Sequence, residues 1–261
     1  MGIINVTPDS FSDGGEFLSH RTAIEHGLKL VEEGADILDV GGESTRPGAE
    51  DISVDEELRR VMPVVEALVA RNLPVSVDTQ KTRVMEEALA AGACMINDVN
   101  AMQAEGALEV IAASAVAICL MHRQGTSKTM QLAPHYDDVV QEVRAFLLSR
   151  AQAAVIAGIP HSRIVLDPGF GFGKTQTHNI ELINGLREFS ATGFPILVGL
   201  SRKRMLGELT GRSSKDRLAA SLTAAIIAVQ NGAAIVRVHD VAATKDALTV
   251  LIALAPFKER A

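Results

Sequence analysis

Residues 163–169 read RIVLDPG, a short apolar, β-branched run that ends in a carboxylate and a proline–glycine turn. A run of this length and composition predicts a buried strand. Asp167 stands at the carboxyl end of that strand, and Gly169 lets the chain turn away from it. The same form recurs along the chain, and each time a longer segment rich in alanine and leucine follows.

Seven further runs have this strand-like form: GIIN (2–5), DILDVGG (36–42), PVSVDT (74–79), CMINDV (94–99), VAICLMH (116–122), PILVGLS (195–201) and AIVRVHD (234–240). The segments between them have helical spacing, most clearly residues 55–71 and 215–232. Glycines expected to end helices precede several of the runs: Gly34, Gly92, Gly158, Gly193 and Gly232. Eight strand–helix units without a linker predict an α/β fold, a single (β/α)8 TIM barrel over residues 1–261. A doubly wound open sheet is the alternative.

Composition narrows the class of protein further. The 261 residues are 47% hydrophobic but only 3% aromatic, so small aliphatic side chains must build the core. The formal net charge of −7 argues against a general nucleic-acid binder. We find no apolar run long enough for a membrane span and no signal peptide in MGIINVTPDS. Cys94 and Cys119 lie in apolar runs and are expected to be buried free thiols, which favours a cytoplasmic protein.

The stretch DPGFGFGKT (167–175) resembles a phosphate-binding loop but departs from it. Only three residues separate Gly169 from Gly173, where a Walker A loop has four, and Pro168 occupies the place of the first glycine. Residues 176–179 are also expected to separate Lys174 from the next helix. We therefore interpret the glycines as a turn over the end of the strand rather than as a nucleotide site.

The carboxyl ends of barrel strands are where catalytic groups gather. Every predicted strand delivers polar residues there: Asn5, Glu43–Arg46, Asp78, Asn97 and Asp98, His122, Asp167, Ser201–Arg204, and Arg237 with His239. The sequence thus predicts an active site at this rim.

Two chemistries are expected at the rim. Asp78, Asn97 and Asp167 suit a flat heterocycle with an exocyclic amine and ring N–H donors, and Lys203 could answer a ring carbonyl or nitrogen. The alternative is that each aspartate caps a helix or pairs with an arginine.

Arg46, Arg237 and His239 form a second group, which suits a phosphorylated tail. Asn5 could give a neutral oxygen to Mg²⁺ there. Alternatively, Arg237 lines the barrel paired with a strand carboxylate. His239 has no neighbour at zinc-ligand spacing.

Eight stretches in order, GIINVTPDSFSDGG, DVGGESTRPGAE, VSVDT, INDV, LMH, DPGFGFGKTQTHN, VGLSRKR and IVRVHDV, resemble the motifs of the dihydropteroate synthase family. The resemblance implies a barrel enzyme that joins 6-hydroxymethyl-7,8-dihydropterin diphosphate to 4-aminobenzoate in folate biosynthesis, releasing diphosphate. It also implies small-molecule substrates, Mg²⁺ as cofactor, a homodimer and a sulfonamide target.

The resemblance assigns residues as follows. The pterin contacts are Asp78, Asn97, Asp167 and Lys203, of which Asp78, Asp167 and Lys203 are catalytic. The diphosphate contacts are Thr45, Arg46, Arg237 and His239, with Asn5 at the metal. The aminobenzoate contacts are Phe11, Pro47, Phe172, Arg202 and Lys203, with Arg202 and Lys203 acting partly through their backbone.

Two departures and two rivals accompany this resemblance. The family usually has a short segment before the first strand, and Arg204 stands where some members have serine. A pterin-binding methyltransferase would share Asp78, Asn97 and Asp167 but would not need Arg46 or the other phosphate-site residues. A non-catalytic pterin-binding relative would have lost a rim loop or Lys203.

Overall fold

The computed structural model describes residues 1–7, 15–46 and 48–254, with the side chains of residues 15–19 outside the description. Each predicted strand run contains one parallel strand of the structure. The strands are β1 (Gly2–Asn5), β2 (Leu38–Gly41), β3 (Val75–Asp78), β4 (Met95–Asp98), β5 (Ala117–Met121), β6 (Ile164–Asp167), β7 (Leu197–Val198) and β8 (Ile235–Val236).

The strands close into a ring. β1 to β6 pair in sequence order in one parallel sheet, and β7 pairs with β8 in a second. Isolated bridges then join Leu166 to Ile196 and Gly2 to Val238, which connects β6 to the β7 side and β8 back to β1. The predicted (β/α)8 barrel is confirmed, and the doubly wound open sheet, whose outer strands would not meet, is wrong.

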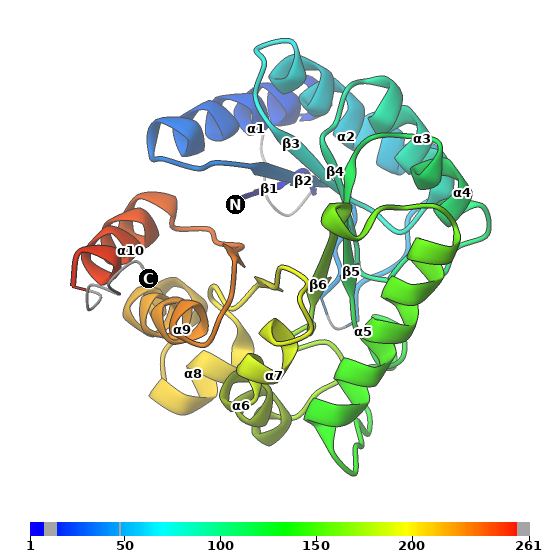
Figure 1. Ribbon diagram of the computed structural model, residues 1–261. Helices are drawn as coiled ribbons and strands as arrows, with labels where there is room; N and C mark the ends of the chain where they lie inside the picture. Colours follow the sequence, from blue (N-terminus) through cyan, green and yellow to red (C-terminus); the bar gives the residue numbers. More distant parts are fainter. Residues whose placement is uncertain (8–14, 47, 255–261) are drawn as a thin grey trace.

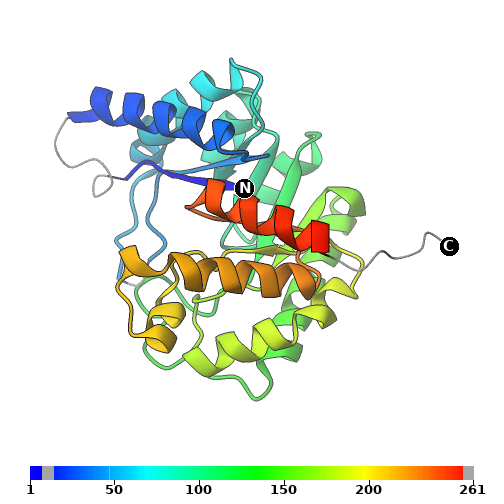
Figure 2. The same cartoon turned by 90° about the vertical axis from the view of Figure 1, so that its left-hand side faces the viewer.

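Helices surround the strands (Figure 1). They are α1 (Gly15–Glu32), α2 (Val54–Val69), α3 (Thr82–Ala90), α4 (Ala107–Ala112), α5 (Val139–Ile156), α6 (Gln176–Asn184), α7 (Leu186–Ser190), α8 (Arg204–Thr210), α9 (Leu218–Gln230) and α10 (Val241–Leu254). The segment 215–232 begins as a helix only at Leu218, because a 3-10 turn occupies Ser214–Asp216. Figure 2 shows α9 and α10 packed side by side.

Local signals explain where helices start and stop. The Ser53 hydroxyl accepts a hydrogen bond from the Glu56 N–H at 3.2 Å and caps α2. Along α2, buried Val61, Val64 and Leu68 face the strands at helical spacing. The predicted helix-ending glycines all have positive φ, from +86° to +100°, which a side chain would make costly.

Alternation along the strands separates two sets of side chains. Ile96, Leu120 and Leu166 point outward into the main core beneath the helices. Their neighbours point into the barrel, where Met95 and Val165 belong to a small apolar cluster. Two residues further along β4 and β6, the inward positions are polar, namely Asn97 and Asp167. The barrel floor is therefore apolar, and its mouth is polar.

The cysteines differ from expectation. Cys119 is buried in the barrel, whereas Cys94 is exposed, because it precedes β4 at the opposite end of the barrel from the rim. Both are free thiols. Across the described residues no helix is long and apolar enough to cross a membrane.

Candidate active site

The predicted ring residues meet inside the barrel mouth. Asp78, Asn97 and Asp167 are the inward residues at or near the ends of β3, β4 and β6. Asn97 and Asp167 are each only 5% exposed. Asp98, by contrast, stabilises the turn that follows it, because its carboxylate accepts the N–H groups of Asn100 at 2.7 Å and Met102 at 2.6 Å. The alternative is also met in part on the inner side, because Asp78 pairs with Arg237 and Asp167 accepts the Gly169 N–H of its own turn.

Arg237 lies between two carboxylates. Its Nε donates to Oδ2 of Asp39 at 2.5 Å, and its Nη2 donates to Oδ2 of Asp78 at 3.0 Å. Asn97 donates to the same Asp39 oxygen at 3.1 Å. The alternative of a barrel-lining arginine thus describes how Arg237 is held. Its Nη1 makes no hydrogen bond within the described residues and remains available to an anion.

Burial shifts the titration of the site groups. Removal from water raises the pKa of Asp167 to about 6, although the N–H of Gly169, at 2.7 Å, opposes this shift. Burial likewise raises the pKa of Asp78, with Arg237 opposing. Burial lowers the pKa of Lys203 to about 8, and Asp167 counteracts it. Both carboxylates would gain from a bound ring that donates hydrogen bonds to them.

Lys203 is placed by its own loop and by Phe172. Its ammonium lies 4.2 Å from the centroid of the Phe172 ring. The preceding residue, Arg202, has a left-handed backbone with φ of +57°, and its guanidinium binds both Asp240 oxygens, at 3.0 and 2.5 Å. The Arg202 side chain is thus occupied by Asp240, and the predicted contact of the Arg202 and Lys203 backbone with aminobenzoate stays a prediction.

The phosphate-site residues lie beside this ring site. His239 Nδ1 lies 3.0 Å from the Ser201 hydroxyl, and its pKa falls to about 4 because of burial and of Arg202 and Arg237 nearby. His239 is therefore a neutral hydrogen-bonding group at neutral pH, not a cation. Arg46 is exposed on the β2 loop beside half-buried Thr45, and its charge acts on both Lys203 and His239.

The glycine-rich turn after Asp167 is stabilised by the buried side chain of Lys174. Lys174 is 3% exposed, and its ammonium contacts His122 Nδ1 at 2.9 Å and the carbonyls of Gly169 and Phe172 at 3.0 and 3.1 Å. The predicted separation from the next helix is wrong, because Thr175 caps α6 directly and the helix begins at Gln176. The Lys174 ammonium is buried and bonded to groups of the protein, so it is not available to a phosphate, which still argues against a nucleotide site.

The remaining predicted residues divide into three cases. Phe11 and Pro47 lie outside the described residues. Arg204 points to solvent and pairs with Glu208 at 2.7 Å, so it does not enter the site. Asn5 ends β1 and is paired in register with Gly41, just before the β2 loop that carries Arg46.

Two features of the site were not predicted from the sequence. Asp39 is fully buried in the middle of β2, and its Oδ1 has no hydrogen-bond partner among the residues that the structure describes. A carboxylate inside the apolar run DILDVGG was a usable signal, because such a group needs a partner. The pairing of His122 with Lys174 joins positions 52 residues apart and had no local signal.

Asn5 fits a hydrated magnesium ion better than a fully protein-bound one. No group of three or more histidine, cysteine, aspartate or glutamate residues arranged for a metal occurs in the described ranges. Asn5 offers one amide oxygen at the end of β1, which would suit Mg²⁺ that keeps several waters and binds through substrate phosphates, and the magnesium site stays a prediction.

Comparison with known proteins agrees with this geometry. Residues 1–239 match the family described as pterin binding enzyme. The chain is 49% identical over 260 residues to a protein of Escherichia coli K12 named dihydropteroate synthase, covering 99% of this chain and 92% of that one.

Two solved structures from Xanthomonas albilineans are similar over nearly their whole length. Dihydropteroate synthase with 4-aminobenzoic acid gives a TM-score of 0.92 at 55% identity, covering 98% of this chain and 93% of that one. Dihydropteroate synthase in complex with 7,8-dihydropteroate gives 0.89 at 53%, covering 98% and 94%. The chain belongs to the pterin-binding enzyme family.

Proposed function

We propose that this chain catalyses the dihydropteroate synthase reaction. It joins 6-hydroxymethyl-7,8-dihydropterin diphosphate to 4-aminobenzoate and releases diphosphate. The observation that carries the proposal is one barrel mouth holding partly buried Asp78 and buried Asn97 and Asp167 beside Lys203 and Arg237. The similarity to dihydropteroate synthases over nearly the full length of both chains supports the same reaction.

The ring site binds the pterin through carboxylate oxygens and an ammonium group that can form hydrogen bonds with the ring. Asp167 is a buried acceptor and Asp78 a partly buried one, and the raised pKa of each carboxyl reflects the cost of holding its charge away from water. Ring N–H and amine donors offset that cost. The Lys203 ammonium, near Asp167, answers an acceptor on the same ring.

These carboxylates also oppose charge that develops during reaction. When diphosphate departs, positive charge spreads over the pterin methylene and ring. Asp78 and Asp167 stand beside that ring and stabilise the charge, and they are already fixed before the reaction begins. The arylamine of 4-aminobenzoate then attacks the methylene carbon, forms the new C–N bond and loses a proton.

The leaving group faces the cationic side of the mouth. Arg237, Arg46 and neutral His239 bind its oxygens, and Asn5 would hold Mg²⁺ there. When bound, Mg²⁺ supplies positive charge to the departing diphosphate. Arg237 also contacts Asp78, so one guanidinium spans the ring site and the phosphate site.

The direct test supplies the purified protein with pterin diphosphate, Mg²⁺ and 4-aminobenzoate and measures dihydropteroate. Asp78→Ala should lower kcat by about 100-fold or more, as expected when charge stabilisation in a transition state is removed. Asp137→Ala is the matched control, because that aspartate side chain is 99% exposed. Equal kcat for the Asp78 and Asp137 variants would contradict the assigned role.

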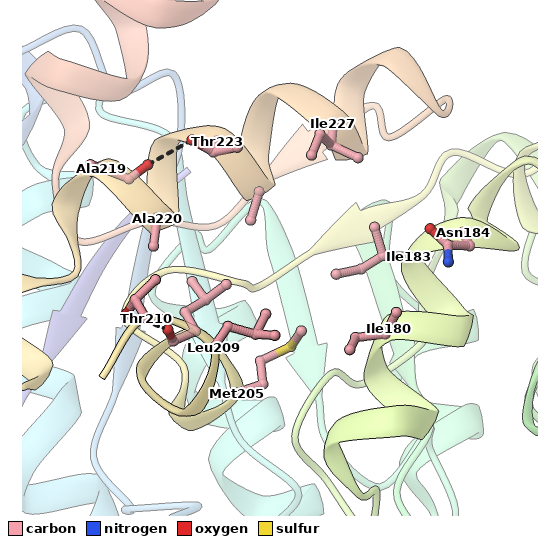
Figure 3. Close-up of a pocket in the computed structure, with 12 residues that line it drawn as sticks. Ile180, Ile183, Asn184, Met205, Leu209, Thr210, Ala219, Ala220, Thr223 and Ile227 are labelled. Atoms are coloured by element: carbon pink, nitrogen blue, oxygen red, sulfur yellow. Dashed lines mark hydrogen bonds between the residues drawn. The ribbon is translucent and has the colours of Figure 1, made fainter. Parts of the chain in front are cut away.

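We further propose that the protein is a homodimer. Residues of α6, α8 and α9 line an apolar groove of about 430 Å³, in which Leu209, Ile180 and Ile227 project from three helices (Figure 3). These three side chains are 55%, 36% and 40% exposed, a grouping that favours an interface. Leu209→Asp should give a monomer in light scattering, and an unchanged mass would refute this interface.

Free thiols at Cys94 and Cys119 support a cytoplasmic location.

A further inference from the structure

The turn that carries Lys203 is held from α9. Arg202 occupies the left-handed region, which costs a non-glycine residue about 1–2 kcal/mol, so the turn needs support from its surroundings. The hydroxyl of Ser221 on α9 accepts a hydrogen bond from the Arg202 N–H at 2.9 Å. That hydroxyl in turn donates to the Arg217 carbonyl at 2.8 Å.

Arg217 supplies the second half of the support. Its Nη1 donates to the carbonyls of Arg202 and Lys203, at 3.1 and 3.3 Å, and its Nε donates to the Arg212 carbonyl at 3.0 Å. The N–H and C=O of Arg202 are thus both fixed by the start of α9. Lys203 follows directly, with its ammonium over Phe172.

Gly207 on α8 makes room for this guanidinium. A Cβ at position 207 would lie 2.1, 2.3 and 2.4 Å from Nη2, Cζ and Nε of Arg217, far inside contact distance. Gly207 is a buried residue within α8 and does not have a positive φ, so backbone conformation does not demand glycine there. The demand comes from Arg217.

We propose that Arg217 and Gly207 form a matched pair that positions Lys203 in the ring site. Gly207 admits the guanidinium, and the guanidinium holds the left-handed turn that aims Lys203 at the pterin. Neither residue touches substrate, so both are positioning residues. The inference rests on the proposed synthase activity.

The pair predicts an unusual result for a glycine-to-alanine change. Alanine favours a helix interior over glycine and offsets part of the loss of the Arg217 hydrogen bonds, so Gly207→Ala should still fold, with a thermal midpoint no lower than that of Arg217→Met. The displaced group is the end of a flexible side chain, which can swing away without unfolding the helix. The variant should nevertheless lose about 10- to 100-fold in kcat/KM for the pterin diphosphate, the range expected when a charged hydrogen bond is lost.

A double-mutant cycle tests the pairing. Arg217→Met should show a similar loss, and the double variant should be within about twofold of Arg217→Met alone, because both changes remove one interaction. Arg212→Met is the matched control, since that exposed side chain takes no part in the bonds described. The alkaline limb of the kcat/KM profile, set by Lys203, should move to higher pH in both single variants and not in the control.

The outcomes separate the two proposals. No dihydropteroate from the unmodified protein would overturn the proposed function and this inference with it. An active unmodified protein with Gly207→Ala and Arg217→Met both within twofold of it would overturn the matched pair alone. Losses that multiply in the double variant would also overturn it. If Gly207→Ala does not fold, Arg217→Met with its pH profile still decides.

Discussion

Replacing Asp167 with asparagine should stabilise the protein while it removes activity. The Asp167 side chain is buried at the mouth of the barrel, where one oxygen accepts the Gly169 N–H at 2.7 Å. The amide oxygen of asparagine can keep this bond. What the substitution removes is the charge, which costs folding free energy in the absence of a bound ring.

The size of the effect follows from the pKa. Burial raises the pKa of Asp167 from 3.8 to about 6, a difference of roughly two units. Each unit corresponds to about 1.4 kcal/mol, so the charge costs at most about 3 kcal/mol at neutral pH. For a chain of this size, each kcal/mol moves the thermal midpoint by about 2–4 °C.

The sign of the pH dependence is fixed as well. Between pH 3.8 and about 6, the folded protein holds the Asp167 proton more tightly than the unfolded chain. The stability contributed by this raised pKa is therefore fully present below 3.8 and is lost as the pH rises through about 6. Asp167→Asn should be more stable than the unmodified protein near neutral pH, and the difference should shrink below about pH 4.

Thermal and urea unfolding at several pH values measure this difference, with Asp137→Asn as the exposed control. A variant that is less stable than the unmodified protein at neutral pH would refute the reasoning, because the buried charge would then contribute more through Lys203 and Lys174 than it costs. A stability gain that persists unchanged at low pH would refute it too. The expected trade between stability and activity is typical of functional sites.

Three other expectations concern pH, the histidine and the glycine turn. The kcat/KM profile should be bell-shaped, falling as the pH drops through about 7 and about 6, where Asp78 and Asp167 gain protons, and falling above about pH 8 as Lys203 loses one; a flat profile would contradict these assignments. Because burial keeps His239 neutral, His239→Gln should retain within about tenfold of the normal kcat/KM, whereas His239→Ala should lose more; equal losses would show that hydrogen bonding is not its role. ATP should show no saturable binding in calorimetry, because Lys174 is buried against His122; Mg²⁺-dependent binding abolished by Lys174→Ala would overturn that expectation.

The sequence alone determined the strand and helix order and the rim. Each strand is short, apolar and followed by a polar residue or glycine, so the ends of strands could be read locally, as RIVLDPG illustrates. Because parallel strands of a barrel end on one rim, this local reading also predicted that Asp78, Asn97 and Asp167 lie together. The helix-ending glycines were predictable for the same reason, since their positive φ is a property of one residue.

Only the tertiary structure decided which partners these side chains have. Arg237 contacts Asp39 across 198 positions of sequence, and Lys174 contacts His122 across 52. Arg217 occupies the space that Gly207 leaves on another helix. Such pairings, and the pKa shifts that burial causes, depend on distances that the folded barrel sets between separate strands and loops. Local sequence predicts which face of a strand each side chain points to, but it does not predict which distant residue that side chain contacts.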